Sequence, residues 1–173
     1  MAERKEIEGL VFDYLHFYGN VDIIRQTRVA YRREIRLIRN GLGVQSWLDA
    51  QGFKHKNQSK LKCLLAAAKI YHYGWCRADL VMKKKVQEMD KLFHGNNAPK
   101  DEFRYQKVWG LKKYPGDHPE VMKQWIEANR NNIDVLSLKP EFDIKNLRLM
   151  VSDFIEDLTG VRVGEYQNYR LTK

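Results

Sequence analysis

Two short stretches of the sequence combine residue types that can transfer protons. Asp117-His118-Pro119-Glu120 places an imidazole among carboxylates, and Asp13 precedes His16 by three residues, which puts both on one face of a helix. Such groups can serve as a general acid and base, or can hold a metal ion. The same residue types also begin helices, because an aspartate caps a helix whose first turn contains a proline and a glutamate. We favour capping and expect no catalytic and no metal-binding residue.

The remaining sequence contains no motif for a known chemistry. It has no GxSxG, no HExxH, no Walker loop, no dinucleotide fingerprint and no zinc-ligand spacing. Cys63 and Cys76 are not part of a CxxC pair, which is typical of small buried hydrophobic residues in a reducing compartment. We therefore expect no cofactor and no enzymatic activity. A nuclease whose carboxylates come together only on folding is our third hypothesis.

The feature of the sequence that points to a function is a row of arginines in the stretch VDIIRQTRVAYRREIRLIRNG. Five of its six arginines recur at steps of three or four, so on a helix they lie within an arc of about 80°. Asp22 and Glu34 are too few to neutralise the row, and guanidinium groups match phosphates well. The pattern predicts a helix that contacts phosphates through Arg25, Arg28, Arg32, Arg33, Arg36 and Arg39.

Two further basic segments are predicted to extend this surface. In the polar connection GFKHKNQSKLK the candidate phosphate contacts are Lys54, Lys56 and Lys60. The segment FRYQKVWGLKKYPG interleaves cations with rings that can stack on bases. Its candidate residues are Arg104, Lys107, Trp109, Lys112, Lys113 and Tyr114.

The elements that would position these residues are predicted to be helices. Apolar residues recur at helical spacing through most of the chain, and we see no regular series of strands. The expected fold is mainly α, a compact bundle of about six to eight helices, with at most a short extended segment near 133–138. The expected helices cover about 2–18, 22–40, 44–50, 59–71, 99–109, 117–128 and 143–158. Residues 82–94 form a further helix or continue the one at 59–71 past Gly74, and the tail can add a short helix near 166–170.

Size and charge predict one domain with two regions. The chain has 173 residues, and 43% of them are hydrophobic, which is enough for a core. Residues 1–115 contain 23 Lys and Arg against 12 Asp and Glu, whereas residues 116–173 contain 8 against 10. We expect a basic helical region, 1–115, and a near-neutral helical region, 116–173, packed together.

These patterns lead to one preferred function and leave its details open. No apolar run is long enough to cross a bilayer, and the charged N-terminal residues do not form a signal peptide, so we expect an intracellular, cytoplasmic protein with no membrane partner. The preferred hypothesis is non-enzymatic binding of RNA or DNA. The alternative is a helical adaptor or inhibitor that docks on an acidic protein surface, including a subunit of a ribonucleoprotein. The oligomeric state is left open.

Overall fold

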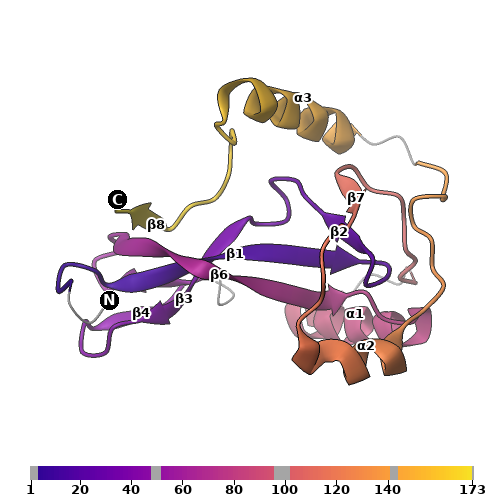
Figure 1. Cartoon of the computed structure of the whole chain (residues 1–173), viewed down its shortest axis with the longest axis horizontal. Coiled ribbons are helices and arrows are strands. Elements are labelled where there is room, and N and C mark those ends of the chain that lie inside the picture. Colours follow the sequence, from indigo (N-terminus) through magenta and orange to yellow (C-terminus); the bar gives the residue numbers. More distant parts are fainter. Residues whose placement is uncertain (1–3, 48–51, 96–101, 141–143, 173) are drawn as a thin grey trace. The chain divides into compact units, whose positions relative to one another are not determined.

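A computed structural model of the chain describes residues 4–47, 52–95, 102–140 and 144–172, and it shows a β-rich fold. The prediction of a helical bundle is therefore wrong. Over those residues the strands are β1 (Gly9–Tyr18), β2 (Ile23–Arg25), β3 (Arg33–Ile38), β4 (Val44–Ser46), β5 (Phe53–His55), β6 (Leu61–Trp75), β7 (Leu111–Lys113) and β8 (Tyr169–Leu171) (Figure 1). The helices are α1 (Asp79–His94), α2 (Lys123–Asn129), α3 (Ile144–Thr159) and the 3-10 helix η2 (Glu120–Met122).

The chain divides into two compact units, each assembled from separate segments. Unit 1 comprises residues 1–15, 27–70 and 151–173, and unit 2 comprises residues 16–26 and 71–150. Strands β1 and β6 and helix α3 each contribute residues to both units. The division expected near residue 115 is not tested by this result and stays a prediction.

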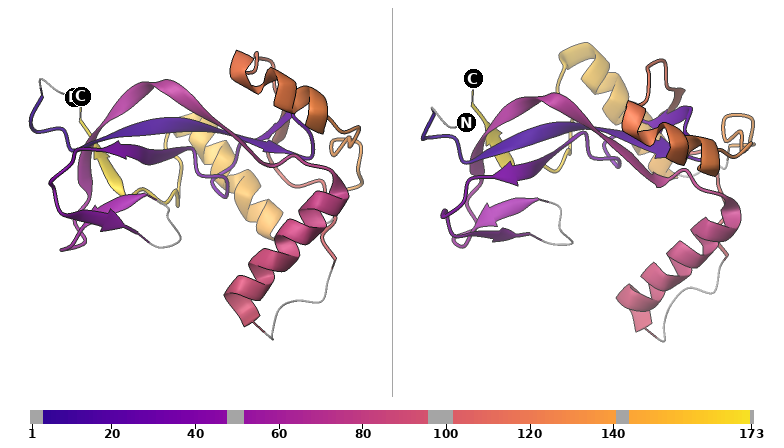
Figure 2. Two further views of the ribbon diagram at one scale, coloured as in Figure 1. Left: turned by 90° about the horizontal axis from the view of Figure 1, so that it is seen from below. Right: turned by 60° about the horizontal axis from the view of Figure 1, so that its bottom comes forward.

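Six strands belong to one mixed sheet. Its order is β7-β2-β1-β6-β8, and β3 also pairs with β1. In unit 1, β3 runs antiparallel to β1 and β8 runs parallel to β6; in unit 2, β2 runs antiparallel to both β1 and β7. Strands β4 and β5 lie side by side as a separate antiparallel ribbon (Figure 2).

Strand β1 shows why the spacing of apolar residues wrongly predicted a helix. Val11 and Phe17, on one face of the strand, are 0% and 1% exposed, whereas Phe12 and Tyr14 on the other face are half-buried. Because apolar residues occupy both faces, the alternation of a strand is hidden and a spacing of three and four appears by coincidence. The many aromatic side chains suit a pleated surface, and pairing with other strands decides the structure.

The segment predicted as an arginine helix forms two strands and the turn between them. Strand β2 ends at Arg25, and β3 begins at Arg33. The register between β1 and β3 shifts between Leu10 and Val11, which pair with Leu37 and Ile35, so Arg36 is the extra residue of β3. A bulge of this kind turns successive side chains away from strict alternation. The six arginines are therefore divided among β2, the turn, β3 and the residue after β3 and do not form one row on a helix.

Each unit has its own hydrophobic core. In unit 1 the buried core residues come from β1, β3, β6 and β8, so it is a core between strands; they are Val11, Ile35, Leu61, Cys63 and Tyr169. In unit 2 the buried core residues lie in β2, α1 and two irregular segments; they are Ile23, Met82, Tyr105 and Val135. The predicted burial of both cysteines is confirmed, since Cys63 and Cys76 are each 0% exposed.

Two of the long predicted helices are confirmed, and their ends are those expected. Helix α1 ends at Gly95, which has a positive φ of 54°, and α3 ends before Gly160, which has a φ of 69°. Glycine adopts this left-handed conformation without steric cost. Residue 143, the expected start of α3, lies outside the described residues.

The other predicted helices are wrong or displaced. Residues 9–18, 44–46, 61–75 and 169–171 are strands, and 102–106 and 133–138 are irregular, with a turn at 135–137 in place of an extended segment. The helical part of 117–128 begins only after Pro119, which has no side-chain cap hydrogen bond. Asp117 is therefore not the predicted helix cap.

Candidate functional site

Arg32 lies in the turn between β2 and β3 and is the centre of an ion-pair network within unit 1. Its Nη1 atom is 2.8 Å from Oε1 of Glu156, and its Nη2 atom is 2.9 Å from Oε2 of Glu165. The second oxygen of Glu156 accepts a hydrogen bond of 2.6 Å from Arg162. These acidic partners lie more than a hundred residues away in the sequence, and they neutralise Arg32.

Three more arginines of the predicted row also have partners inside the protein. Arg33 donates a 2.6 Å hydrogen bond to Asp13, and Arg36 bonds to Glu34 and to the Tyr14 hydroxyl. Arg39 donates to the backbone carbonyls of Ile7 and Arg4 at 3.1 Å and 3.0 Å. These side chains hold β3 and the N-terminal segment together, so their first role is structural.

Burial shifts the pKa values of two charged groups of the same segment. Burial raises the pKa of Glu34, which is 4% exposed, although Arg36 opposes the shift. Burial also lowers the pKa of Arg25, whose Nε atom has no hydrogen-bond partner among the described residues. Arg25 pairs with His16 and with Leu111 across the sheet, so it too is built into the fold.

The lysines of residues 54–62, which we call the lysine loop, differ from these arginines. The loop contains Lys54, Lys56, Lys60 and Lys62, and the last three are exposed. None of the four forms an ion pair with any acidic residue that the structure describes. Lys54 lies with its Nζ atom 3.8 Å from the centre of the Trp47 ring, a cation–π contact. The loop therefore carries an excess of positive charge, since Glu8 is the described carboxylate that contacts it.

A tight turn shapes the lysine loop. The Asn57 side chain accepts hydrogen bonds from the backbone N–H and the hydroxyl of Ser59, at 3.0 Å and 2.7 Å. The backbone N–H of Gln58 donates to the carbonyl of His55 at 2.8 Å. Asparagine and serine stabilise turns through such bonds to neighbouring backbone groups. These bonds define the backbone of the turn from which Lys56 and Lys60 project.

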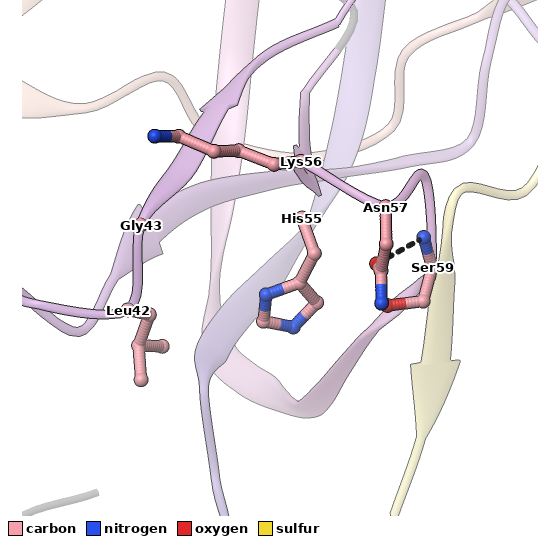
Figure 3. Close-up of a pocket in the computed structure, with 6 residues that line it drawn as sticks. All are labelled: Leu42, Gly43, His55, Lys56, Asn57 and Ser59. Atoms are coloured by element: carbon pink, nitrogen blue, oxygen red, sulfur yellow. Dashed lines mark hydrogen bonds between the residues drawn. The ribbon is translucent and has the colours of Figure 1, made fainter.

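An open pocket of about 500 Å³ adjoins the lysine loop. Figure 3 shows the His55 ring between Leu42 and Asn57. The His55 ring is positioned by Glu8, because its Nε2 atom is 3.0 Å from Oε1 of that carboxylate. The other oxygen of Glu8 accepts a 2.7 Å hydrogen bond from the backbone N–H of Lys62. The pocket is lined by Leu42, Gly43, His55, Lys56, Asn57 and Ser59.

The second basic segment, residues 103–114, is only partly available for binding. Phe103 and Tyr105 pack in the core of unit 2, and the Tyr114 hydroxyl donates to Tyr71 at 3.3 Å. Strand β7 leaves Lys112 and Lys113 exposed. The other candidate residues are exposed or half-buried, and they are Arg104, Lys107 and Trp109, the last 37% exposed.

The histidines considered for catalysis make packing contacts in unit 2. The Nδ1 atom of His118 is 2.8 Å from the Tyr73 hydroxyl, and burial lowers the pKa of His118. His16 and His72 face each other with their Nδ1 atoms 3.2 Å apart. Phe17 stacks on Tyr73 with the ring centres 4.7 Å apart, so these groups belong to an aromatic cluster.

The cysteine thiols are protected from reaction. Burial raises the pKa of Cys63 and that of Cys76 to about 12. Within the described residues no three His, Cys, Asp or Glu side chains are grouped so that they could hold a metal ion. Over the same residues no helix is long and apolar enough to cross a bilayer.

Comparison with known proteins gives no relative: no protein-family model, no curated protein and no solved structure matches this chain.

The structure adds neighbours to the candidate site that the sequence did not single out as contacts. Trp47 and His55 lie beside the lysines, and Lys62 ends the lysine segment whose Lys54, Lys56 and Lys60 were the predicted contacts. The acidic partners Glu156 and Glu165 could not be found, because only folding brings them to Arg32.

Proposed function

We propose that this protein is a non-enzymatic nucleic-acid-binding protein that contacts phosphates mainly through the lysine loop. The observation that supports the proposal is the difference between the two kinds of cation in unit 1. Four lysines within nine residues have no acidic partner in the described structure, whereas Arg32, Arg33 and Arg36 are paired internally. Unpaired cations that lie close together are what a phosphate backbone requires.

The neighbouring rings favour a single strand or a loop as the ligand. Trp47 and His55 are half-buried beside exposed lysines, and His55 lines an open pocket. Aromatic and imidazole rings stack on unpaired bases, while lysines follow the backbone. RNA and single-stranded DNA satisfy both contacts equally well. We expect this activity inside the cell.

Binding of labelled oligonucleotides tests the proposal. Single-stranded RNA, single-stranded DNA and duplex DNA are titrated with the protein by fluorescence anisotropy over a series of salt concentrations. The test variant carries Lys56→Gln, Lys60→Gln and Lys62→Gln. It should lose about a hundredfold in affinity near 0.1 M salt, and its log–log salt slope should fall by about 2, because three phosphate contacts are removed.

The matched control carries Lys84→Gln, Lys91→Gln and Lys139→Gln, which remove the same charge at exposed positions elsewhere. This control should bind within about threefold of the wild type, since charge at a distance is screened by salt. Equal losses in both variants would show that net charge alone matters and would overturn the lysine loop as the site. No binding of any nucleic acid at low salt would reject the proposal. If the protein binds poly-glutamate but binds no nucleic acid, the result would indicate an acidic protein partner instead.

A further inference from the structure

A second cavity lies within unit 1 and contains none of the lysines of the lysine loop. Its volume is about 120 Å³, roughly the space of four water molecules. The turn between β2 and β3, the start of β3, and the chain just before β8 surround it. The lining residues are Arg28, Val29, Tyr31, Arg33, Glu34, Glu165, Tyr166 and Asn168.

Most charges in this lining are already neutralised. Arg33 is paired with Asp13, and each glutamate of the lining has an arginine, Glu34 with Arg36 and Glu165 with Arg32. Arg28 differs, because it forms no ion pair with the acidic residues that the structure describes. The lining therefore has one uncompensated positive charge at a half-buried position.

The Arg28 guanidinium lies close to the backbone of Gly164, where a side chain would collide with it. Gly164 has a φ of +74°, and a Cβ atom placed there would lie 2.6 Å from Nη1 of Arg28. Any other residue would push the guanidinium away and would also strain the backbone. The position of Arg28 thus depends on a glycine that is distant in the sequence.

We propose that this pocket binds a small organic monocarboxylate whose carboxylate group is held by the Arg28 guanidinium. A planar carboxylate matches the two parallel N–H donors of an arginine. One unpaired cation balances one negative charge, and the two lining carboxylates, although paired, disfavour a phosphate dianion. The volume admits a molecule of about the size of acetate or glycolate.

The experiment follows the Arg28 side chain directly by NMR. The ¹⁵N-labelled protein is titrated with sodium acetate, sodium glycolate and sodium phosphate, and the ionic strength is held constant with sodium chloride. The Nε–Hε signal of Arg28 should shift and saturate with either carboxylate, and it should not saturate with phosphate. A shift that grows linearly with every salt, or a tighter saturable response to phosphate, would overturn the proposal.

Variants separate the site from general effects of added salt. Arg28→Gln should abolish saturable binding, measured on the backbone signals of residues 164–168, and Arg28→Lys should weaken it about tenfold because the bidentate contact is lost. Arg170→Gln removes an exposed arginine of β8 and should leave binding unchanged. If Arg28→Gln does not fold, Gly164→Ala serves as the second test, since it displaces the guanidinium. Saturable binding of unchanged strength in these variants would reject the role of Arg28.

Carboxylate binding at Arg28 and nucleic-acid binding at the lysine loop can be tested independently of each other. The Lys56, Lys60 and Lys62 variant should bind acetate as the wild type does, because none of these residues lines the pocket.

Discussion

Arg32 was predicted to contact phosphates, but it forms ion pairs inside the protein. Its side chain remains 34% exposed, yet both ends of its guanidinium are occupied by glutamates that are 18% and 14% exposed. A partly buried pair of this kind is worth more than a surface ion pair, because removing the arginine would leave two mostly buried carboxylates without that partner. We therefore consider Arg32 a structural residue.

Replacing this residue should reduce stability. Arg32→Gln should lower the free energy of unfolding by about 2 kcal/mol, since two charged hydrogen bonds are lost while Glu156 keeps Arg162. Urea unfolding followed by fluorescence measures the loss. Arg170→Gln, an exposed arginine with no ion pair in the described structure, is the control and should change stability by less than about 0.5 kcal/mol. A change of similar size in both variants would contradict the structural role of Arg32.

At the scale of the elements, the turn between β1 and β2 depends on one residue, Gly19. Gly19 has a φ of +79°, and a Cβ atom there would lie 2.5 Å from Cγ1 of the buried Val135. The segment that contains Val135 also binds this turn, because Asn131 donates to the carbonyl of Gly19 at 3.0 Å. Asn20 in turn donates to the carbonyl of Ile133 at 2.6 Å. The turn and the irregular segment 131–135 thus fix each other within unit 2.

An alanine at this turn should be costly for two separate reasons. Gly19→Ala should destabilise the protein by about 3 kcal/mol, through the left-handed backbone and through the clash with Val135. Gly41→Ala is the matched control: its φ is +81°, but nothing lies within 4 Å of the added atom, so only about 1 kcal/mol should be lost. Thermal unfolding measures both. In a double mutant with Val135→Ala, part of the Gly19→Ala cost should disappear; strictly additive effects would show that the clash is relieved in another way.

At the scale of the whole molecule, the two cysteines report separately on the two units. Cys63 belongs to the core of unit 1, and Cys76 lies in unit 2. Both are 0% exposed, and burial raises the pKa of each thiol from 9.0 to about 12. At pH 8 the native protein would hold only about one thiolate in ten thousand at each site.

Thiol labelling should therefore be negligible until a unit opens. With iodoacetamide at pH 8, we expect no labelling in native buffer and labelling of both cysteines in denaturant, each identified by mass spectrometry of its tryptic peptide. Rapid labelling of the native protein would contradict the burial. Stability should also fall as the pH rises above 9, because the unfolded thiols lose protons there while the native thiols keep them. Urea midpoints at pH 8 and pH 10 measure this decrease.

The sequence predicted local features well and long-range ones poorly. Helices α1 and α3 were predicted because the spacing that forms a helix is local, and the burial of Cys63 and Cys76 was expected from their residue type. The strands were missed because apolar residues on both faces of β1, and the run of alanines in β6, imitate a helix. The ion pairs of Arg32 were missed because their partners are distant in the sequence. The lysines of the lysine loop were singled out because they are neighbours along the chain, and their role in binding stays a prediction.

Strand β8 covers what would otherwise be an unprotected edge of the sheet. It pairs in parallel with residues 61–63 of β6, and Tyr169 is 4% exposed in the same core as Leu61. A chain shortened to end at residue 168 would present the backbone of β6 and a hydrophobic core to solvent, a template on which another copy could add a strand. We therefore expect residues 169–171 to shield this part of the edge of β6, and their removal to promote aggregation.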